Sequence, residues 1–285
     1  MRNLQRIICG VFLAAGTGVW LVGTAPAETL AEKTLVEIAE RQRDIFARAE
    51  KEGEQLDQAW LRGELESVIK SYDVLIQKNP EYALAYGGYG MLLGRVGMTK
   101  EAVAILLKAN KLDPAMPEVK NQIAVHLAED GKPVDALPWV MAAIDLEPQK
   151  PLYHFHLGEL LAAGRSAFIL TGHFDGPKVD QAVLDAFKRA AELSPGDFPL
   201  AYRHGKAYYD LETPRWAEAL PVWDKIEALA TTDSQRQLVR LQRANVLIKL
   251  ARPAEARLLL GTVINQELAL EKQTLLDELA KAGDK

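Results

Sequence analysis

Histidines are the residues of this chain whose chemistry most directly suggests a metal site. His154 and His156 form the closest pair, in the segment YHFHLGE. In a helix, residues two apart lie about 200° around the axis, so these two imidazoles cannot bind one metal from the same face. His126 and His173 have no second potential ligand at the required spacing in the sequence, and His204, directly before Gly205, is expected to be packed. The sequence therefore predicts no metal site.

A glycine-rich segment, GGYGMLLG at 87–94, has a Gly-x-Gly spacing that suggests a nucleotide-binding loop. Such a loop must follow a strand, whereas this segment is predicted to lie inside a helix, so no nucleotide site is expected. Gly87, Gly90, Gly94 and Gly97 step by three and four residues, which places them on one helical stripe. Each interior glycine costs about 1 kcal/mol relative to alanine. We expect close approach of another helix to offset this cost; a ligand against the bare backbone is the alternative.

Catalytic signatures are missing from the rest of the sequence. There is no nucleophile elbow, no His-Glu-x-x-His motif and no phosphate-binding loop. Glu28, Glu32, Glu37 and Glu40 recur at helix-surface spacing, which is typical of a solvated face. An enzyme would need a site assembled from distant helices without a local signature. We therefore expect a protein that is not an enzyme and has no cofactor.

The first 27 residues have the parts of a secretory signal. Arg2 and Arg6 precede an apolar run that ends in the small residues Ala25-Pro26-Ala27. We predict cleavage after Ala27 and a periplasmic or secreted protein. The alternative is an inner-membrane anchor formed by residues 7–25, which are about as many as a bilayer-spanning helix requires.

Charge and cysteine content bound the mature chain further. Cys9 is the only cysteine and follows Ile8, where a lipoprotein signal requires a small residue, so neither lipidation nor a disulfide is expected. Removing the signal takes away two positive charges and no acid, which moves the net charge from −5 to −7. This acidity argues against nucleic acid as a partner. Membrane association is expected only if the signal stays uncleaved.

A period of 34 residues organises the rest of the chain. Pro80, Pro114 and Pro148 are 34 residues apart and close the phrases IQKNP, NKLDP and IDLEP. Pro195 closes a fourth phrase, ELSP, after 47 residues. A period of this length indicates a solenoid of stacked structural repeats.

The residues within each period resemble the tetratricopeptide repeat family, and an exported bacterial member of it. The matching positions are Tyr86, Gly90, Leu93, Ala102, Leu106, Ala109 and Pro114 in one unit and Ile123, Ala124, Leu127, Ala136, Val140, Ala143 and Pro148 in the next. The resemblance implies an all-α right-handed superhelical solenoid of antiparallel helix pairs with capping helices at both ends.

We divide the chain on this basis. The predicted segments are the signal at 1–27, an N-terminal capping pair at 28–80, repeats at 81–264 and a C-terminal capping helix at 265–285. The repeats are 81–114, 115–148, 149–195, 196–231 and 232–264. The third repeat carries 13 extra residues between its two helices. We expect its first helix to run on to near Leu170, a turn at TGHFDG and a helix starting at Pro177.

The insert has two interpretations. Its apolar run SAFILTG favours packing on a neighbouring repeat, while Phe168, His173 and Phe174 could instead form a partner-binding lip.

The resemblance also implies a ligand groove lined by the first helix of each pair. The corresponding residues are Gly87, Gly88, Met91, Asn121, Gln122, Val125, Phe155, His156, Glu159, Tyr202, Arg203 and Lys206. Asn121 and Val125 stand where one subgroup has the lysine and asparagine that grip a peptide carboxylate, so that clamp is not expected. Arg203 and Lys206 either hold an acidic group of a partner or neutralise Asp197, Asp210 and Glu212.

These features predict a non-catalytic scaffold or adaptor of the bacterial envelope that binds a protein or peptide segment. The alternatives are a chaperone-like holder of exported proteins and an assembly factor for an envelope or polysaccharide export complex.

Overall fold

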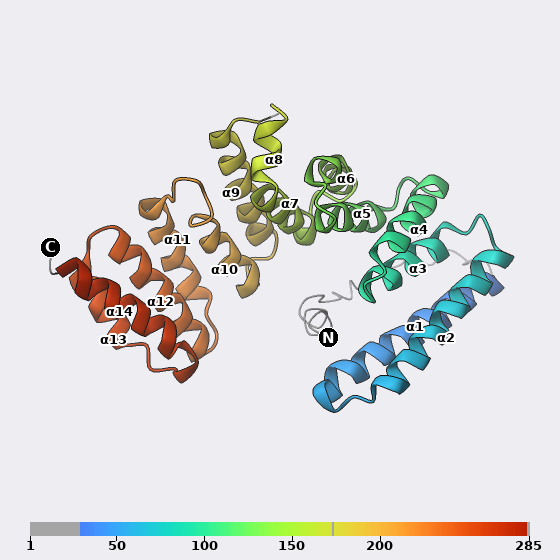
Figure 1. Cartoon of the computed structure of the whole chain (residues 1–285), viewed down its shortest axis with the longest axis horizontal. Helices are drawn as coiled ribbons and strands as arrows, with labels where there is room; N and C mark the ends of the chain where they lie inside the picture. The colour runs from blue at the N-terminus through green and yellow to red at the C-terminus, as the bar shows by residue number, and fades with distance from the viewer. Residues whose placement is uncertain (1–28, 173, 284–285) are drawn as a thin grey trace, which may run out of the picture. The chain divides into compact units, whose positions relative to one another are not determined.

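The computed structural model of the protein describes residues 29–172 and 174–283, and every regular element in them is a helix (Figure 1). The chain divides into two compact units, with the boundary between Leu127 and Ala128. The predicted signal with its cleavage site, the alternative anchor at 7–25 and Cys9 all lie outside the described residues. Among the residues that are described, no helix is both long and apolar enough to cross a bilayer.

The first unit is built from helices that pack in sequential pairs. They are α1 (Leu30–Glu52), the short 3-10 helix η1 (Gly53–Gln55), α2 (Gln58–Lys78), α3 (Ala83–Arg95), α4 (Thr99–Leu112) and α5 (Pro117–Glu129), whose last turn passes the boundary. As predicted, α1 pairs with the helix that contains ELESVIKSYDVLIQK, which is α2. Their contact buries Ile38 and Ile45 of α1 against Val68, Tyr72 and Leu75 of α2.

The glycine stripe of α3 is explained by close approach of neighbouring elements. A Cβ atom built on Gly90 would lie 2.6 Å from Cγ of Leu106 in α4, and one on Gly94 would collide with the imidazole of His126 in α5. A Cβ on Gly87 would meet Met116 at 2.9 Å. The predicted helix packing is therefore confirmed for these three glycines. Gly97 differs, because it follows the end of α3 with a φ of +84°, in the left-handed region that glycine tolerates.

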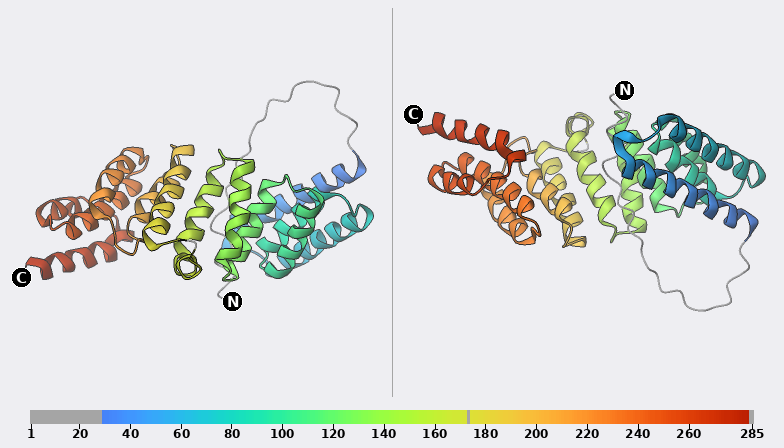
Figure 2. Two further views of the ribbon diagram at one scale, coloured as in Figure 1. Left: turned by 90° about the horizontal axis from the view of Figure 1, so that it is seen from above. Right: turned by 90° about the horizontal axis from the view of Figure 1, so that it is seen from below.

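The second unit continues the pairing with one irregularity (Figure 2). Its helices are α6 (Pro133–Leu146), α7 (Pro151–Ala163), α8 (Arg165–Leu170), α9 (Gly176–Leu193), α10 (Phe198–Ala207), α11 (Trp216–Leu229), α12 (Asp233–Lys249), α13 (Pro253–Gly261), the 3-10 helix η2 (Gln266–Leu268) and α14 (Ala269–Gly283). The most extensive contacts are those of α7 with α9, α12 with α13 and α11 with α12, and α10 packs on both α9 and α11. The prediction of an all-α fold of sequential helix pairs is thus confirmed.

The inserted segment departs from the prediction at Gly164. We expected one helix to continue to near Leu170, but α7 ends at Ala163 and a separate helix, α8, begins at Arg165. The glycine at the break allows α6 to pack closely here, because a Cβ at position 164 would lie 2.6 Å from Cβ of Pro133. The predicted re-entry is confirmed: Asp175 caps α9, its side chain accepts a hydrogen bond from the amide of Lys178, and a proline follows in the first turn.

The C-terminal segment packs through its apolar stripe. Leu279 of α14 is 2 % exposed and joins Leu241 of α12 and Leu260 of α13 in one buried cluster. Leu268 and Leu275 are partly buried against the same cluster.

Candidate interaction surface

Six of the predicted groove residues lie on α7 and α10, the first helices of neighbouring pairs in the second unit. We call the surface formed by Phe155, His156, Glu159, Tyr202, Arg203 and Lys206 the α7–α10 face. Its centre is Arg203, whose Nε lies 2.5 Å from Oε1 of Glu159 and whose Nη1 lies 2.8 Å from Oδ2 of Asp210. The guanidinium also stacks 4.0 Å from the centre of the Phe187 ring. Two acids and an aromatic ring therefore hold this arginine in place.

Only one of the three acids that were expected to neutralise Arg203 pairs with it. Asp210 pairs with Arg203 as anticipated, whereas Asp197 accepts a hydrogen bond from the amide of Leu200 and caps α10. Glu212 pairs with a different residue, Arg165. The second acid on Arg203 is Glu159, 44 positions earlier in the sequence.

Lys206 has a different environment from Arg203. Its Nζ lies 4.7 Å from the centre of the Tyr209 ring, and within the described residues it forms no ion pair. Tyr209 is itself fixed, because its hydroxyl donates a hydrogen bond to the carbonyl oxygen of Gln242 at 3.2 Å. Lys206 therefore presents a positive charge on an aromatic ring, and no described carboxylate forms an ion pair with it.

The aromatic part of the α7–α10 face is half-buried. Phe155 packs edge-on against Phe187, with ring centres 5.9 Å apart, and Tyr202 packs against Trp223 at 5.2 Å. Burial raises the pKa of Tyr202 to about 12, so its hydroxyl stays protonated at neutral pH. Burial lowers the pKa of His156 to about 4, despite the opposing influence of Glu129, which leaves the imidazole neutral.

The remaining predicted groove residues belong to the first unit. Asn121 of α5 is fully buried and lies inside the fold, where a ligand arriving from solvent would not contact it. Met91 of α3 and Gln122 and Val125 of α5 are half-buried. Of the predicted groove residues in the second unit, the structure joins Glu159 to Arg203 and packs both Phe155 and Arg203 on Phe187. It gives Asn121 a packing position.

Comparison with known proteins identifies the architecture. No family model and no curated protein matches the sequence. PilW, a widely conserved type IV pilus biogenesis factor, matches 88 % of this chain and 100 % of its own with a TM-score of 0.60 and 13 % identity. YrrB, a TPR protein with an unusual peptide-binding site, matches 73 % of this chain and 99 % of its own with a TM-score of 0.57 and 16 % identity. MamA 41-end from Desulfovibrio magneticus RS-1 covers 71 % of this chain and 97 % of its own, with a TM-score of 0.53 and 16 % identity.

The chain has the tetratricopeptide-repeat fold. The small positions of that fold are visible in the second unit, where two glycines on first helices face large rings on second helices. A Cβ at Gly158 would lie 2.8 Å from the ring of Phe187, and one at Gly205 would lie 2.7 Å from the ring of Trp223. These contacts bring α7 onto α9 and α10 onto α11, and they set the position of the α7–α10 face.

Phe168, offered above as part of a partner-binding lip on this fold, is instead a core residue. Its side chain is 1 % exposed and packs edge-on against Phe174, with ring centres 6.0 Å apart. Phe174 is half-buried, and His173 lies outside the described residues. Phe168 therefore supports packing, which is the interpretation that the apolar run favoured, whereas Leu170 at the end of α8 is 87 % exposed.

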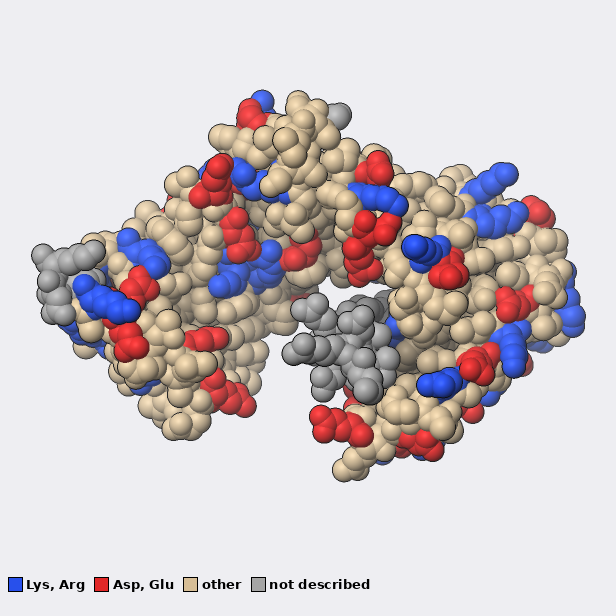
Figure 3. All heavy atoms as spheres, viewed as in Figure 1, with Lys and Arg blue, Asp and Glu red and all other residues tan. Residues whose placement is uncertain are grey.

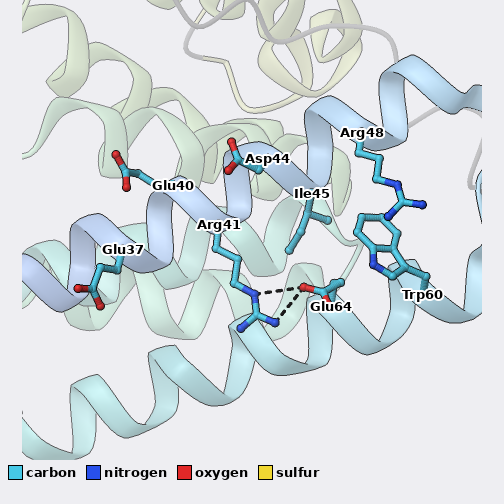
Figure 4. A pocket seen from close by; sticks show the side chains of 8 residues that line it. All are labelled: Glu37, Glu40, Arg41, Asp44, Ile45, Arg48, Trp60 and Glu64. Atoms are coloured by element: carbon cyan, nitrogen blue, oxygen red, sulfur yellow. Dashed lines mark hydrogen bonds and ion pairs between the residues drawn. The ribbon is translucent and has the colours of Figure 1, made fainter.

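A hollow between α1 and α2 was not expected from the sequence (Figure 4). Nε and Nη2 of Arg41 reach from α1 to Glu64 of α2 at 3.1 and 2.9 Å, and the Arg48 guanidinium lies 3.9 Å from the centre of the Trp60 ring. Glu40 and Asp44 point away from α2 in this view. The missed signal was the arginine spacing on α1, seven residues apart, because two turns place both side chains on the face toward α2.

Elsewhere on the surface, positively and negatively charged side chains are interspersed. On the face drawn in Figure 3, lysines and arginines alternate with acidic residues without a broad region of one sign. Within the described residues, no three histidine, cysteine or acidic side chains come together as a metal site.

Proposed function

We propose that the protein is a non-catalytic interaction module that binds a segment of another protein on the α7–α10 face. The observation that carries this proposal is the contrast between its two cations. Arg203 is held by Glu159 and Asp210, whereas Lys206 lies over Tyr209 and forms no ion pair with any residue that the structure describes. A partner can therefore supply the missing anion to Lys206 without displacing an existing ion pair.

The chemistry of this face defines the partner segment. Phe155 and Tyr202 offer half-buried aromatic surface, which suits an apolar side chain of the partner. Lys206 suits one carboxylate, either an acidic side chain or a chain end. The proposed ligand is thus a segment with an apolar anchor and one acidic group. The tetratricopeptide-repeat fold, shared with a protein that has a peptide-binding site, supports this proposal.

Reversing the charge at position 206 provides the test. Cross-linking of the tagged protein in its native envelope fraction, followed by mass spectrometry, should recover one or two stoichiometric partners. With purified partner, Lys206→Glu should weaken binding at least about tenfold, because a partly buried charge-assisted hydrogen bond is replaced by repulsion. Titration calorimetry gives the affinity of each variant.

Lys100→Glu is the matched control for this experiment. Lys100 is an exposed lysine in the first turn of α4, in the first unit, and its reversal makes the same change in net charge. Equal affinities for Lys206→Glu and the unmodified protein would remove the α7–α10 face from the proposal. Recovery of a broad range of exported proteins in weak complexes would favour the chaperone-like holder.

The proposed location is outside the cytoplasm, in the periplasm or medium after cleavage behind Ala27, or on the inner membrane if residues 7–25 stay in place. This rests on the sequence features of the first 27 residues. N-terminal sequencing of the protein from cells distinguishes the two, because only the cleaved form begins at Glu28.

A second candidate is an assembly factor for an envelope machine. It is favoured by the PilW comparison, in which the whole of a type IV pilus biogenesis factor is matched. Loss of a surface fibre or exported polymer in a deletion strain, restored by the unmodified gene but not by the Lys206→Glu gene, would support this role.

A further inference from the structure

The insert in the second unit contacts elements on both sides of its own helix pair. On one side, bare backbone at Gly164 lies against Pro133, the first residue of α6. On the other side, Arg165 at the start of α8 reaches the loop between α10 and α11. Residues 164 and 165 of the insert thus contact α6 on one side and, beyond their own α7–α9 pair, the α10–α11 pair on the other.

Arg165 makes the longer of these connections through two carboxylates. Its Nε lies 2.7 Å from Oδ1 of Asp180 in α9, and its Nη2 lies 2.6 Å from Oε2 of Glu212 in the α10–α11 loop. The side chains of Arg165 and Asp180 are 19 % and 11 % exposed, so this arm is shielded more than an ordinary surface ion pair, whereas Glu212 is 69 % exposed. One guanidinium therefore joins the insert to its own pair and to the next.

Gly176 allows the guanidinium to occupy this position. A Cβ at Gly176 would lie 2.7 Å from Nη2 of Arg165 and 3.4 Å from Oε2 of Glu212. A side chain here would have to push this arm of the bridge aside. The glycine at the start of α9 is thus explained by the bridge above it.

An apolar contact inside the insert holds α8 in place. Phe168 is 1 % exposed and packs against Phe174, which follows the turn after α8. A second arginine crosses the same junction, because Nη1 of Arg215 lies 2.9 Å from Oε1 of Gln181 in α9. The insert is therefore anchored by an apolar contact and flanked by polar bridges.

We propose that the described part of the insert, residues 164–172 and 174–176, acts as a strap that fixes the angle between α6, the α7–α9 pair and the α10–α11 pair. A stack of helix pairs bends easily, because each pair contacts only its neighbours. The strap adds a connection across two junctions at the edge of the stack. This inference concerns the rigidity of the second unit and is independent of what the α7–α10 face binds.

The test measures the spread of distances across the strap. In the full chain, Cys9→Ser removes the only cysteine, and Met141→Cys on α6 with Ala228→Cys on α11 provides two exposed positions for spin labels. Pulsed electron resonance then reports the distance distribution. Glu212→Ala cuts only the arm to the α10–α11 loop, and Glu212 is 69 % exposed, so this variant is expected to fold.

We expect a narrow distribution for the unmodified strap and about a twofold broader one for Glu212→Ala. Hydrogen exchange in residues 208–215 should rise about fivefold, as local opening becomes easier. Arg165→Met should broaden the distribution further, because both arms are lost. The matched control is Glu255→Ala, which cuts the local pair between Arg252 and Glu255 on α13. A distribution and an exchange rate unchanged in Glu212→Ala would overturn the strap.

Discussion

Replacing Gly205 by leucine is expected to lower the free energy of unfolding of the second unit by about 3 kcal/mol. A Cβ atom at this position would lie 2.7 Å from the ring of Trp223 and 2.9 Å from Cδ1 of Ile226. Trp223 is fully buried and Ile226 is 3 % exposed, so neither can move aside without disturbing the core. The added side chain would separate α10 from α11.

Denaturant unfolding followed by circular dichroism measures this effect. The matched control is Gly63→Leu, because Gly63 is also helical but is exposed, with no atom within 4 Å of the position of its Cβ. That variant should gain up to about 1 kcal/mol from helix propensity alone. A Gly205→Leu protein as stable as the unmodified one would show that the α10–α11 contact tolerates a side chain there.

Lowering the pH from 7 to 4 is expected to destabilise the second unit through two buried histidines. Burial lowers the pKa of both His156 and His204 to about 4, whereas an unfolded histidine titrates near 6.5. Between these values the unfolded chain binds more protons than the folded chain, so the free energy of unfolding falls with the pH. The stabilising contribution of the two neutral histidines is fully present above pH 6.5. By pH 4, each histidine lowers the free energy of unfolding by up to about 3 kcal/mol.

His204 gives the sharper test of this pH dependence. Its Nε2 is buried and makes no hydrogen bond within the described residues. Besides burial, Lys188 and Lys225 oppose its protonation and Glu192 favours it. His204→Leu fills a similar volume without a titrating group, so its unfolding free energy should fall less steeply between pH 6.5 and 4.

Thermal or denaturant unfolding at several pH values provides that slope. His154→Gln is the control, because Nε2 of His154 contacts the carbonyl oxygen of Pro148 near the surface. If His204→Leu kept the full slope of the unmodified protein, the imidazole at position 204 would not be a source of acid sensitivity.

Sequence patterns were sufficient to predict those features that depend only on a residue type and its spacing along the chain. Pro114 and Pro148 mark the ends of second helices, and Gly90 with Gly94 predicted the close approach of other helices. These features are local, because proline stops a helix and glycine permits contact whatever partner arrives. The helix pairs could therefore be predicted before any contact was known.

Features that depend on a distant partner were not predictable. The break at Gly164 reflects contact with Pro133, which is 31 residues earlier. Glu159 of α7 was predicted to line the groove, but its ion pair with Arg203 of α10 was not anticipated. As an aromatic residue, Phe168 was compatible with either a partner-binding lip or the core, and only its surroundings in the structure place it in the core. A single sequence gives residue types and spacing, but not which faces meet.

Sequential pairing also determines how the second unit acquires its structure. Its strongest helix contacts join elements that are next to each other or one short helix apart, as in α7 with α9 and α12 with α13. Such contacts close short loops, and the entropy lost on closure grows with loop length. Among small two-state domains, those dominated by such local contacts fold fastest. Each pair can then serve as the template on which the next one forms.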